Sequence, residues 1–444
     1  MEIQLSDHFT YKKLIKFTVP SVIMMIFSSV YGMVDGFFVS NFAGELGFKA
    51  VNFIMPVLML LGAVGFMFGA GGSALISKTL GEGDKKRANG IFSFVVYTSI
   101  ITGVVLAILG IIFLKPIAIA LGAGAMLENC IIYGVIILVA LPFFMLQMEF
   151  QSLFVTAEKP QVGLFVTIGA GVTNMVLDAL FIAVFKWGIA GAAIATALSQ
   201  TVGGIVPIIY FLRKNNNSLL KLSKPVFDFK ALLKVVTNGS SELMTNISLS
   251  VMGILFNYQL LKYAGEEGDG IAANGVLMYV GFMFLSIFIG YSIGVAPVIG
   301  YHYGAQNHKE LKSLLKKSHI IILVLSLSMF ALGEALAAPL SQVFVGYSER
   351  ILEMTIRAFR LYSFCFLIVG FNIFGSAFFT ALNNGLVSAI LSFLRLFLYQ
   401  AITVIVMPLF MELDGIWLSS TASELMAIIT TFAFVFALRK RYKY

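Results

Sequence analysis

Apolar stretches, most of them 20 residues or longer, follow one another along almost the whole chain. Short segments with charged residues, glycine or proline separate them. An α-helix of about 20 apolar residues crosses a bilayer, and in lipid only a helix or a closed barrel satisfies its own backbone hydrogen bonds. Only 12% of the residues are charged, whereas a soluble domain carries about 25%. The chain is therefore predicted to be an all-α membrane protein whose main partner is the lipid bilayer.

The stretches predict twelve transmembrane helices. In the first half they cover residues 14–39, 49–78, 92–114, 130–156, 162–185 and 188–212. In the second half they cover residues 232–262, 272–302, 318–339, 357–380, 386–410 and 415–438. With 444 residues, this count leaves no room for a large soluble domain.

Positive charge predicts how the helices are oriented. Of the 30 lysines and arginines, 22 fall on the side of both termini, and 7, including Arg357 and Arg360, fall on the other side. The remaining one, Arg395, lies within the eleventh stretch. Cytoplasmic loops carry the excess of positive charge, so we expect a multi-pass protein of the cell inner (plasma) membrane with both termini cytoplasmic. The net charge of +8 reflects these loops and does not indicate a nucleic-acid partner.

The chain divides into two similar halves. A basic, asparagine-rich linker at residues 213–230 separates an N-lobe, residues 1–212, from a C-lobe, residues 231–444. Residues 154–157 resemble residues 378–381, and the glycine turn near residue 81 recurs 223 residues later. Chance similarity between apolar helices is the alternative explanation. The pattern predicts two pseudo-symmetric six-helix lobes, an arrangement typical of transporters whose site lies between the repeats.

Asp35 is an ionisable residue inside the first stretch, where a charge is costly. Ser28 and Tyr31 precede it by seven and four residues and share its helical face. This polar stripe indicates either a functional carboxylate or an aspartate hydrated near the membrane surface.

Asp178 lies in the fifth stretch with Asn174 one helical turn earlier. A carboxylate and an amide on one face offer several oxygens, the ligands that hard cations prefer. The pair indicates a site for H⁺ or Na⁺. Alternatively, the two residues form a hydrogen-bonded pair with a structural role.

Further polar residues occur in other stretches. Thr196 and Gln200 lie beside a stripe of small residues that predicts close helix packing, namely Gly191, Ala195, Ser199 and Gly203. In the second half, Glu242 is a candidate for a cavity wall. Arg395 needs an acidic partner, which Glu242 or Glu424 can supply.

Other function classes find no support in the sequence. The glycines at positions 69, 71 and 72 lack the lysine and Ser/Thr of a phosphate-binding loop. The four histidines lack metal-ligand spacing, and no nucleophile–base set indicates an enzyme.

The sequence resembles the multidrug and toxic compound extrusion (MATE) family over essentially its whole length, and most closely the DinF-like and MepA-like bacterial branch. The resemblance rests on the order and spacing of short motifs. They are residues 34–39 around Asp35, residues 44–47, Ala50, Pro56, residues 80–84, Asn174 with Asp178, and residues 188–193 leading to Thr196.

The resemblance implies two lobes around a V-shaped cavity and alternating access driven by H⁺ or Na⁺. It implies a cation-coupling site in the N-lobe, matched here by Asp35, Asn174, Asp178 and Thr196. Pro20 matches a proline associated with bending of the first helix. Two positions depart from the family pattern. Gln151 stands where an asparagine is expected, and the acidic pair of the NorM-like branch has no clear counterpart in the C-lobe.

The expected function is secondary active multidrug efflux: antiport of amphipathic cationic compounds against H⁺ or Na⁺, with antibiotic resistance as a consequence. The candidates for the substrate cavity are Tyr31, Ser28, Gln151, Gln200 and Glu242. We expect a monomer with no cofactor beyond the coupling ion and no metal other than Na⁺ at the coupling residues. The rival is a lipid-linked oligosaccharide flippase of the same superfamily. Its cavity should be rich in Arg and Lys, whereas Arg395 is the only basic residue well inside a stretch.

Overall fold

The computed structural model of the protein describes residues 3–213, 216–225, 227–264, 269–346 and 348–444. These residues form helices and loops without a β-strand. The first half contains α1 (Tyr11–Phe42), α2 (Glu45–Gly81), α3 (Lys85–Ala120), η1 (Gly124–Met126), α4 (Leu127–Thr156), α5 (Pro160–Asp178), the π-helix η2 (Ala179–Val184) and α6 (Gly188–Leu212). The second half contains α7 (Phe229–Ala264), α8 (Asp269–Gly304), α9 (His308–Val345), α10 (Glu349–Ser363), α11 (Phe366–Ala381), α12 (Gly385–Phe393), the π-helix η3 (Leu394–Tyr399), α13 (Gln400–Val406) and α14 (Pro408–Tyr442).

The predicted all-helical membrane fold is confirmed. Ten described helical segments are long and apolar enough to cross a membrane, and α10 with α11 forms an eleventh span that bends by 51°. The remaining long helix, α7, has 36 residues and carries polar side chains such as Asn238, Glu242 and Asn246, so composition alone does not identify it as a span. A polar spanning helix is tolerated where protein covers its polar face, and α7 packs on α2 and α12.

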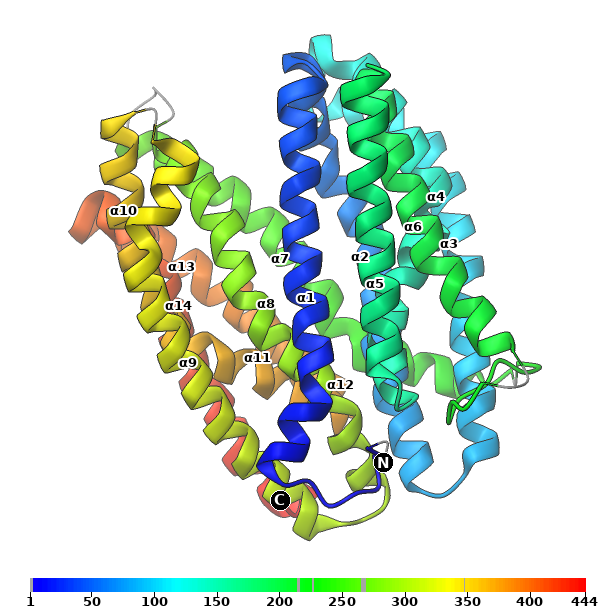
Figure 1. Cartoon of the computed structure of the whole chain (residues 1–444). Helices are drawn as coiled ribbons and strands as arrows, with labels where there is room; N and C mark the ends of the chain where they lie inside the picture. The colour runs from blue at the N-terminus through cyan, green and yellow to red at the C-terminus, as the bar shows by residue number, and fades with distance from the viewer. Residues whose placement is uncertain (1–2, 214–215, 226, 265–268, 347) are drawn as a thin grey trace.

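Figure 1 shows two groups of helices that lie together near both termini and diverge toward the opposite face. In the first group α4 contacts α2, α3 and α6, and α5 contacts α1 and α6. In the second group α10 contacts α8, α9 and α14, and α12 contacts α7 and α11. We call these groups the first and the second bundle. The linker predicted at residues 213–230 connects the two groups along the chain, and its described part packs on α3, where the backbone nitrogen of Ser223 donates to Ser93 Oγ (2.9 Å). It includes residues 214, 215 and 226, which are outside the described residues.

The turns after α2 and α8 have the same geometry. Gly83 and Gln306 both have a positive φ, of 88° and 55°. The next residues, Asp84 and Asn307, cap the following helices by accepting hydrogen bonds from the backbone nitrogens three residues later. The positions differ by 223 residues, so the structure confirms the repeat at this turn.

The two bundles meet where α2 crosses α7 at very short range. A Cβ added to Gly71 would lie 2.0 Å from the backbone oxygen of Val235, and one added to Gly239 would lie 1.9 Å from that of Met67. Only glycine allows the two backbones to approach so closely.

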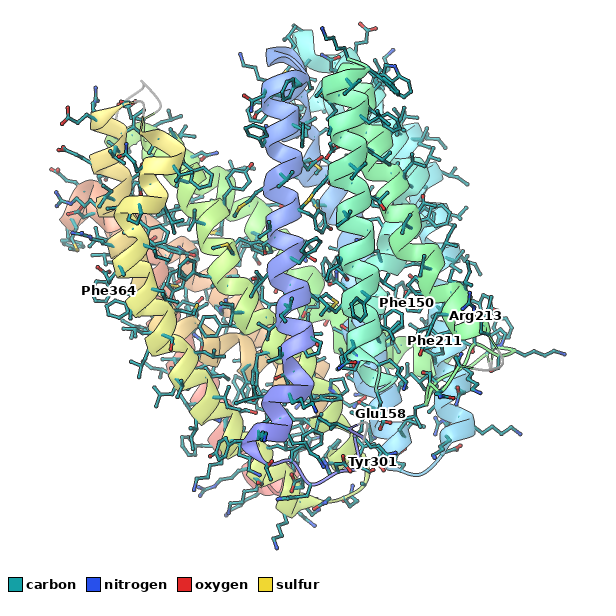
Figure 2. All side chains as sticks on the ribbon, viewed as in Figure 1. Phe150, Glu158, Phe211, Arg213, Tyr301 and Phe364 are labelled. Atoms are coloured by element: carbon teal, nitrogen blue, oxygen red, sulfur yellow. The ribbon has the colours of Figure 1, made fainter. Side chains whose placement is uncertain are left out.

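Residues 3–10, which we call the N-terminal strap, cross the face that carries the termini and contact both bundles. The backbone nitrogen of Leu5 donates to Glu158 Oε1 (2.6 Å) in the turn between α4 and α5. The backbone nitrogen of Phe9 donates to Glu310 Oε1 (2.9 Å) in the first turn of α9. Leu5 and Phe9 are fully buried. Figure 2 shows Glu158 and Tyr301 at this end of the molecule.

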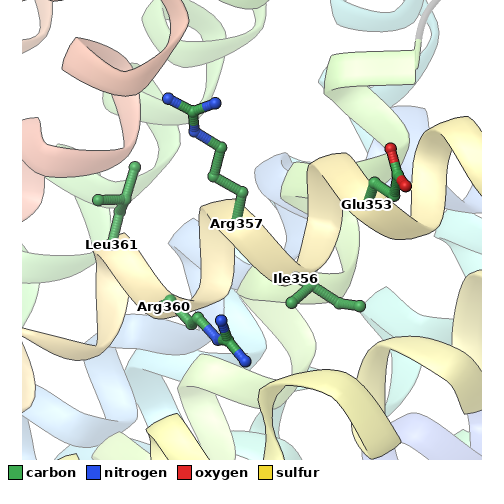
Figure 3. A pocket seen from close by; sticks show the side chains of 5 residues that line it. All are labelled: Glu353, Ile356, Arg357, Arg360 and Leu361. Carbon is green, nitrogen blue, oxygen red and sulfur yellow. The ribbon is translucent and has the colours of Figure 1, made fainter.

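Several predicted helix boundaries were wrong. The third, ninth and tenth spans were expected to start at residues 92, 318 and 357, whereas α3, α9 and α10 begin at Lys85, His308 and Glu349. Arg357 and Arg360 were counted on the outer side, at the start of the tenth span. The structure places both arginines inside α10 (Figure 3). The charged residues of α10 recur at helical spacing on one side, so an amphipathic helix resembles a polar loop when only apolar runs are considered.

Candidate cation-binding site

Three helices of the first bundle bring the four predicted coupling residues together. Asn174 and Asp178 lie one turn apart at the end of α5. The Asp35 side chain of α1 interacts with those of Asp178, Thr196 and Asn174. Asn174 Nδ2 donates to Thr196 Oγ1 of α6 at 3.5 Å. We call Asp35, Asn174, Asp178 and Thr196 the acidic cluster.

Small residues and an irregular turn allow this convergence. A Cβ on Gly171 of α5 would lie 2.5 Å from Phe27 Cε1 and 2.9 Å from Tyr31 Cδ1, so glycine lets α5 approach α1. Directly after Asp178 the helix widens into the π-helix η2, an irregularity frequent at functional sites. In the predicted small stripe, a Cβ on Gly203 would lie 2.6 Å from the Gln147 side chain of α4, which confirms close packing of α6.

The acidic cluster has buried oxygens without hydrogen-bond partners. Within the described part of the chain, these are Asp35 Oδ1, Asn174 Oδ1 and both carboxylate oxygens of Asp178. Asp178 is fully buried, and the described residues provide no ion pair for either aspartate. A buried charge without a partner is costly, and either a proton or a hard cation relieves this cost. Two carboxylates, an amide oxygen and a hydroxyl therefore suit H⁺ or Na⁺.

Two residues near the acidic cluster were missed in the sequence. Tyr133 of α4 is buried and interacts with Thr196 and both aspartates. Gln147 interacts with Tyr31. They lie 14 residues apart, about four helical turns, and therefore share a face of α4. This spacing of polar side chains in an apolar stretch was the available signal.

The residues expected to form the substrate cavity are only partly brought together. Gln200 lines a cavity of about 10 Å³ beside Thr196 and Tyr133, which holds about one water molecule. Tyr31 lies next to Asp35, and the buried Oγ of Ser28 has no hydrogen-bond partner among the described residues.

Three further predicted residues lie away from this cavity. Gln151 is buried on α4, and its Nε2 contacts Met148 Sδ (4.0 Å). Glu242 belongs to the second bundle and interacts with Arg395. Pro20 lies inside α1, which runs without a break from Tyr11 to Phe42.

The second bundle contains its own buried ionic network. Arg395 Nε lies 2.7 Å from Glu424 Oε1, and Asn372 Nδ2 donates to Glu424 Oε2 at 2.6 Å. Of the two partners considered for Arg395, Glu424 forms the ion pair and Glu242 interacts as a second acid.

Two pseudo-symmetric bundles of membrane-spanning helices, with unpaired acids buried in one of them, define the class as a two-lobe membrane transporter. The sequence model named MatE matches residues 20–180 and 243–406, well over half of the chain, so the chain belongs to the MatE family of multidrug efflux transporters.

The chain is similar to multidrug export protein MepA of Staphylococcus saprophyticus, with 27% identity over 366 residues, or 81% of this chain and 80% of the relative. MepA of Staphylococcus aureus is 24% identical over 368 residues, with the same shares. A solved structure described as the outward-facing conformation of a multidrug resistance MATE family transporter has a TM-score of 0.92 and 22% identity. The match covers 98% of this chain and 97% of the chain in that structure. The fold is therefore the twelve-helix fold of these transporters.

Proposed function

We propose that this protein exports amphipathic cationic compounds by antiport against H⁺ or Na⁺. The observation that carries the proposal is a pair of carboxylates, the fully buried Asp178 and the partly buried Asp35, which have buried oxygens without hydrogen-bond partners and no basic partner among the described residues. The similarity to proteins named multidrug export protein supports the direction of transport and the class of substrate.

The acidic cluster accounts for coupling if the ion and the substrate compete for the same charge. A bound H⁺ or Na⁺ neutralises Asp35 and Asp178 and weakens their attraction for a cationic compound. Release of the ion restores the negative charge and strengthens this attraction. Such reciprocal binding is the thermodynamic requirement for antiport. Asn174 Oδ1 and the Thr196 hydroxyl would complete the oxygen shell of Na⁺.

The conformational change is proposed to move the two lobes, residues 1–212 and 231–444, relative to each other. Pro20 has no backbone N–H and therefore removes one hydrogen bond inside α1. This weak point would let α1 bend and carry Asp35 with it. The protein is proposed to act as a monomer in the plasma membrane, with its termini in the cytoplasm.

Transport of a fluorescent cationic dye in proteoliposomes tests the proposal. A pH gradient and a Na⁺ gradient are imposed separately, and only one of them is expected to drive dye movement. Asp35→Asn and Asp178→Asn are each expected to abolish the dye movement that the ion gradient drives. Glu128→Gln is the matched control, because Glu128 is an exposed acid at the start of α4. Driven transport that persists in the Asp35→Asn/Asp178→Asn variant would contradict the mechanism.

The rival function is transfer of a lipid-linked oligosaccharide. The buried Arg395 gives it little support, because Glu424 already neutralises this guanidinium. Dye that does not move under either gradient, together with movement of a pyrophosphate-linked lipid between leaflets, would favour the flippase.

A further inference from the structure

Three basic side chains converge at the end of the molecule that carries the termini. Lys78 lies in the last turn of α2, Lys234 in the second turn of α7, and Arg441 in the last turn of α14. Lys234 interacts electrostatically with both of the others. We call these three residues the basic cluster. Lys78 belongs to the first bundle and its two partners belong to the second, so the cluster lies where the two bundles meet.

Two tyrosines direct two members of the basic cluster toward each other. Lys78 Nζ lies 5.9 Å from the centre of the Tyr303 ring, and Arg441 Cζ lies 5.6 Å from the centre of the Tyr442 ring. The two rings contact each other edge to face, with their centres 5.7 Å apart. The face of an aromatic ring attracts a cation, so one tyrosine pair holds positive groups from both bundles.

Backbone packing keeps these like charges close. A Cβ on Gly304 of α8 would lie 2.0 Å from the backbone oxygen of Lys78, and one on Gly81 of α2 would lie 2.0 Å from that of Tyr301. Gly81 and Gly304 are equivalent positions of the repeat, 223 residues apart. Figure 2 shows Tyr301 at this end of the molecule. The backbone of Lys78 is therefore fixed against α8 as long as the two bundles stay together at this face.

The described acids around the basic cluster do not balance its charge. Lys78 Nζ lies 3.4 Å from Glu82 Oε1, one helical turn later. The other two members of the cluster are exposed and form no ion pair within the described ranges. Asp228, which precedes α7, pairs with Arg87 instead (3.6 Å). Three positive charges thus face a single exposed carboxylate, and their mutual repulsion favours a bound anion.

We propose that the basic cluster binds a phosphate group and thereby holds the two bundles together at this face. A guanidinium binds phosphate oxygens through two parallel hydrogen bonds, and the two lysines act as point charges. The phosphate belongs either to a lipid headgroup of the adjacent leaflet or to a soluble molecule. Once bound, it offsets the repulsion between Lys78 of the first bundle and its partners on the second. The site goes beyond the proposed antiport, and only its effect on the spacing of the bundles rests on the proposed movement of the lobes.

Titration of the full chain with inorganic pyrophosphate tests the site. The protein is kept in dodecyl maltoside, a detergent without phosphate, and calorimetry at constant ionic strength is expected to show saturable binding. Lys234→Gln and Arg441→Gln should each weaken this binding about tenfold, because each removes one charge-assisted contact. Lys234→Arg should keep most of the affinity. Lys312→Gln is the matched control, since Lys312 is an exposed lysine near the start of α9 and lies outside the basic cluster.

Two results would overturn the site: no saturable binding to the wild type, or an equal loss of affinity in the control. Neither result bears on the proposed antiport, because the titration uses no substrate and no ion gradient. Unfolding midpoints without an anion separate binding from a structural role. Lys234→Gln removes a repelled charge and should leave the midpoint unchanged or higher, whereas a clear fall would assign Lys234 to folding and contradict the inference.

Spin labels at Lys86→Cys and Lys309→Cys, two exposed positions at the starts of α3 and α9, report the spacing of the bundles. The two natural cysteines are buried and should stay unlabelled. Pyrophosphate is expected to shift the measured distances toward shorter values, and Lys234→Gln should abolish the shift. Distances that stay the same despite binding would refute the closing role.

Phosphatidylglycerol added to the same micelles identifies the source of the phosphate. Loss of pyrophosphate binding would assign the basic cluster to a lipid headgroup, and full retention would assign it to a soluble phosphate. Both results support the site. Oleate, which is anionic and lacks phosphate, controls for the charge of the micelle. An equal loss with oleate would show that the cluster accepts any negative charge and would overturn the assignment to phosphate.

Discussion

Arg395 and Glu424 form an ion pair inside the second bundle, with Arg395 Nε 2.7 Å from Glu424 Oε1. Their side chains are only 12% and 6% exposed. Glu242 also interacts with Arg395, so one guanidinium serves two acids. Loss of one partner from a buried pair leaves an uncompensated charge, which is more damaging than loss of an exposed pair.

Arg395→Met is therefore expected to lower the free energy of unfolding by roughly 3 kcal/mol, because it leaves both acids without their partner. Glu424→Gln should lower the free energy of unfolding by a smaller amount, because Arg395 still interacts with Glu242. Thermal unfolding in detergent measures both effects. The control is Arg350→Met in the exposed pair Arg350–Asp269 (3.1 Å), with an expected loss below about 1 kcal/mol. A larger loss in Glu424→Gln than in Arg395→Met would refute the shared-guanidinium interpretation.

The crossing of α2 and α7 depends on the absence of a side chain at Gly239. Gly239→Ala should destabilise the protein by about 1–3 kcal/mol, because its Cβ would lie 1.9 Å from the Met67 backbone oxygen, which belongs to a helix and cannot move away easily. Gly253→Ala in the same helix is the control, since a Cβ there meets no atom within 4 Å. It should be neutral or slightly stabilising. Similar unfolding midpoints for the two variants would show that α2 and α7 can move apart without loss of stability.

The spacing of α1 and α5 should control transport. Gly171→Val places a branched side chain against Phe27 and Tyr31, and should move Asp35 away from Asp178. We expect dye transport to fall about tenfold or more, because a displacement of about 1 Å at a positioned site has effects of this size. Gly169→Val is the control, since the space around Gly169 is open to 4 Å. Equal activity of the two variants would mean that the contact between α1 and α5 does not set the geometry of the acidic cluster.

Glu158, which holds Leu5 of the N-terminal strap, should make stability depend on pH. Burial raises the pKa of Glu158, although the hydrogen bond from the Leu5 backbone acts in the opposite direction. A carboxyl whose pKa is raised on folding favours the folded state when protonated, and this contribution is lost as the pH rises through its folded pKa. Glu158→Gln should therefore gain stability over the wild type as the pH rises above about 4.5, and the difference should vanish in more acidic solution. Unfolding midpoints recorded across this range check the expectation, and a difference that does not vary with pH would contradict it.

The sequence was sufficient for the helical architecture because lipid leaves few alternatives for a chain with so few charges. The sequence was less informative about features of the fold that depend on tertiary packing. The 51° bend between α10 and α11 falls at Phe364 and Cys365, where no proline or glycine marks it. The predicted tenth span began at residue 357, later than α10, because the charged residues at the start of α10 resemble those of a loop.

The same contrast between what the sequence predicts and what packing determines applies to the candidate site. The shared face of Asn174 and Asp178 follows from helical spacing alone. Their approach to Asp35 and Thr196 depends on how three helices pack, and only the family resemblance indicated it. Tyr133 was missed because a single tyrosine in an apolar stretch is indistinguishable from a core residue until its neighbours are known.

The N-terminal strap sets a limit on how far the bundles can separate at the face that carries the termini. Its two anchors, the backbone nitrogens of Leu5 and Phe9, are four residues apart, and a fully extended chain spans at most about 14 Å over that length. Glu158 and Glu310 can move apart only until residues 5–9 are fully extended. Any wider opening must first detach Leu5 or Phe9 from its carboxylate. The strap thus limits how far the protein can open at this face, and its release becomes a step that can be timed independently of the ion and the substrate.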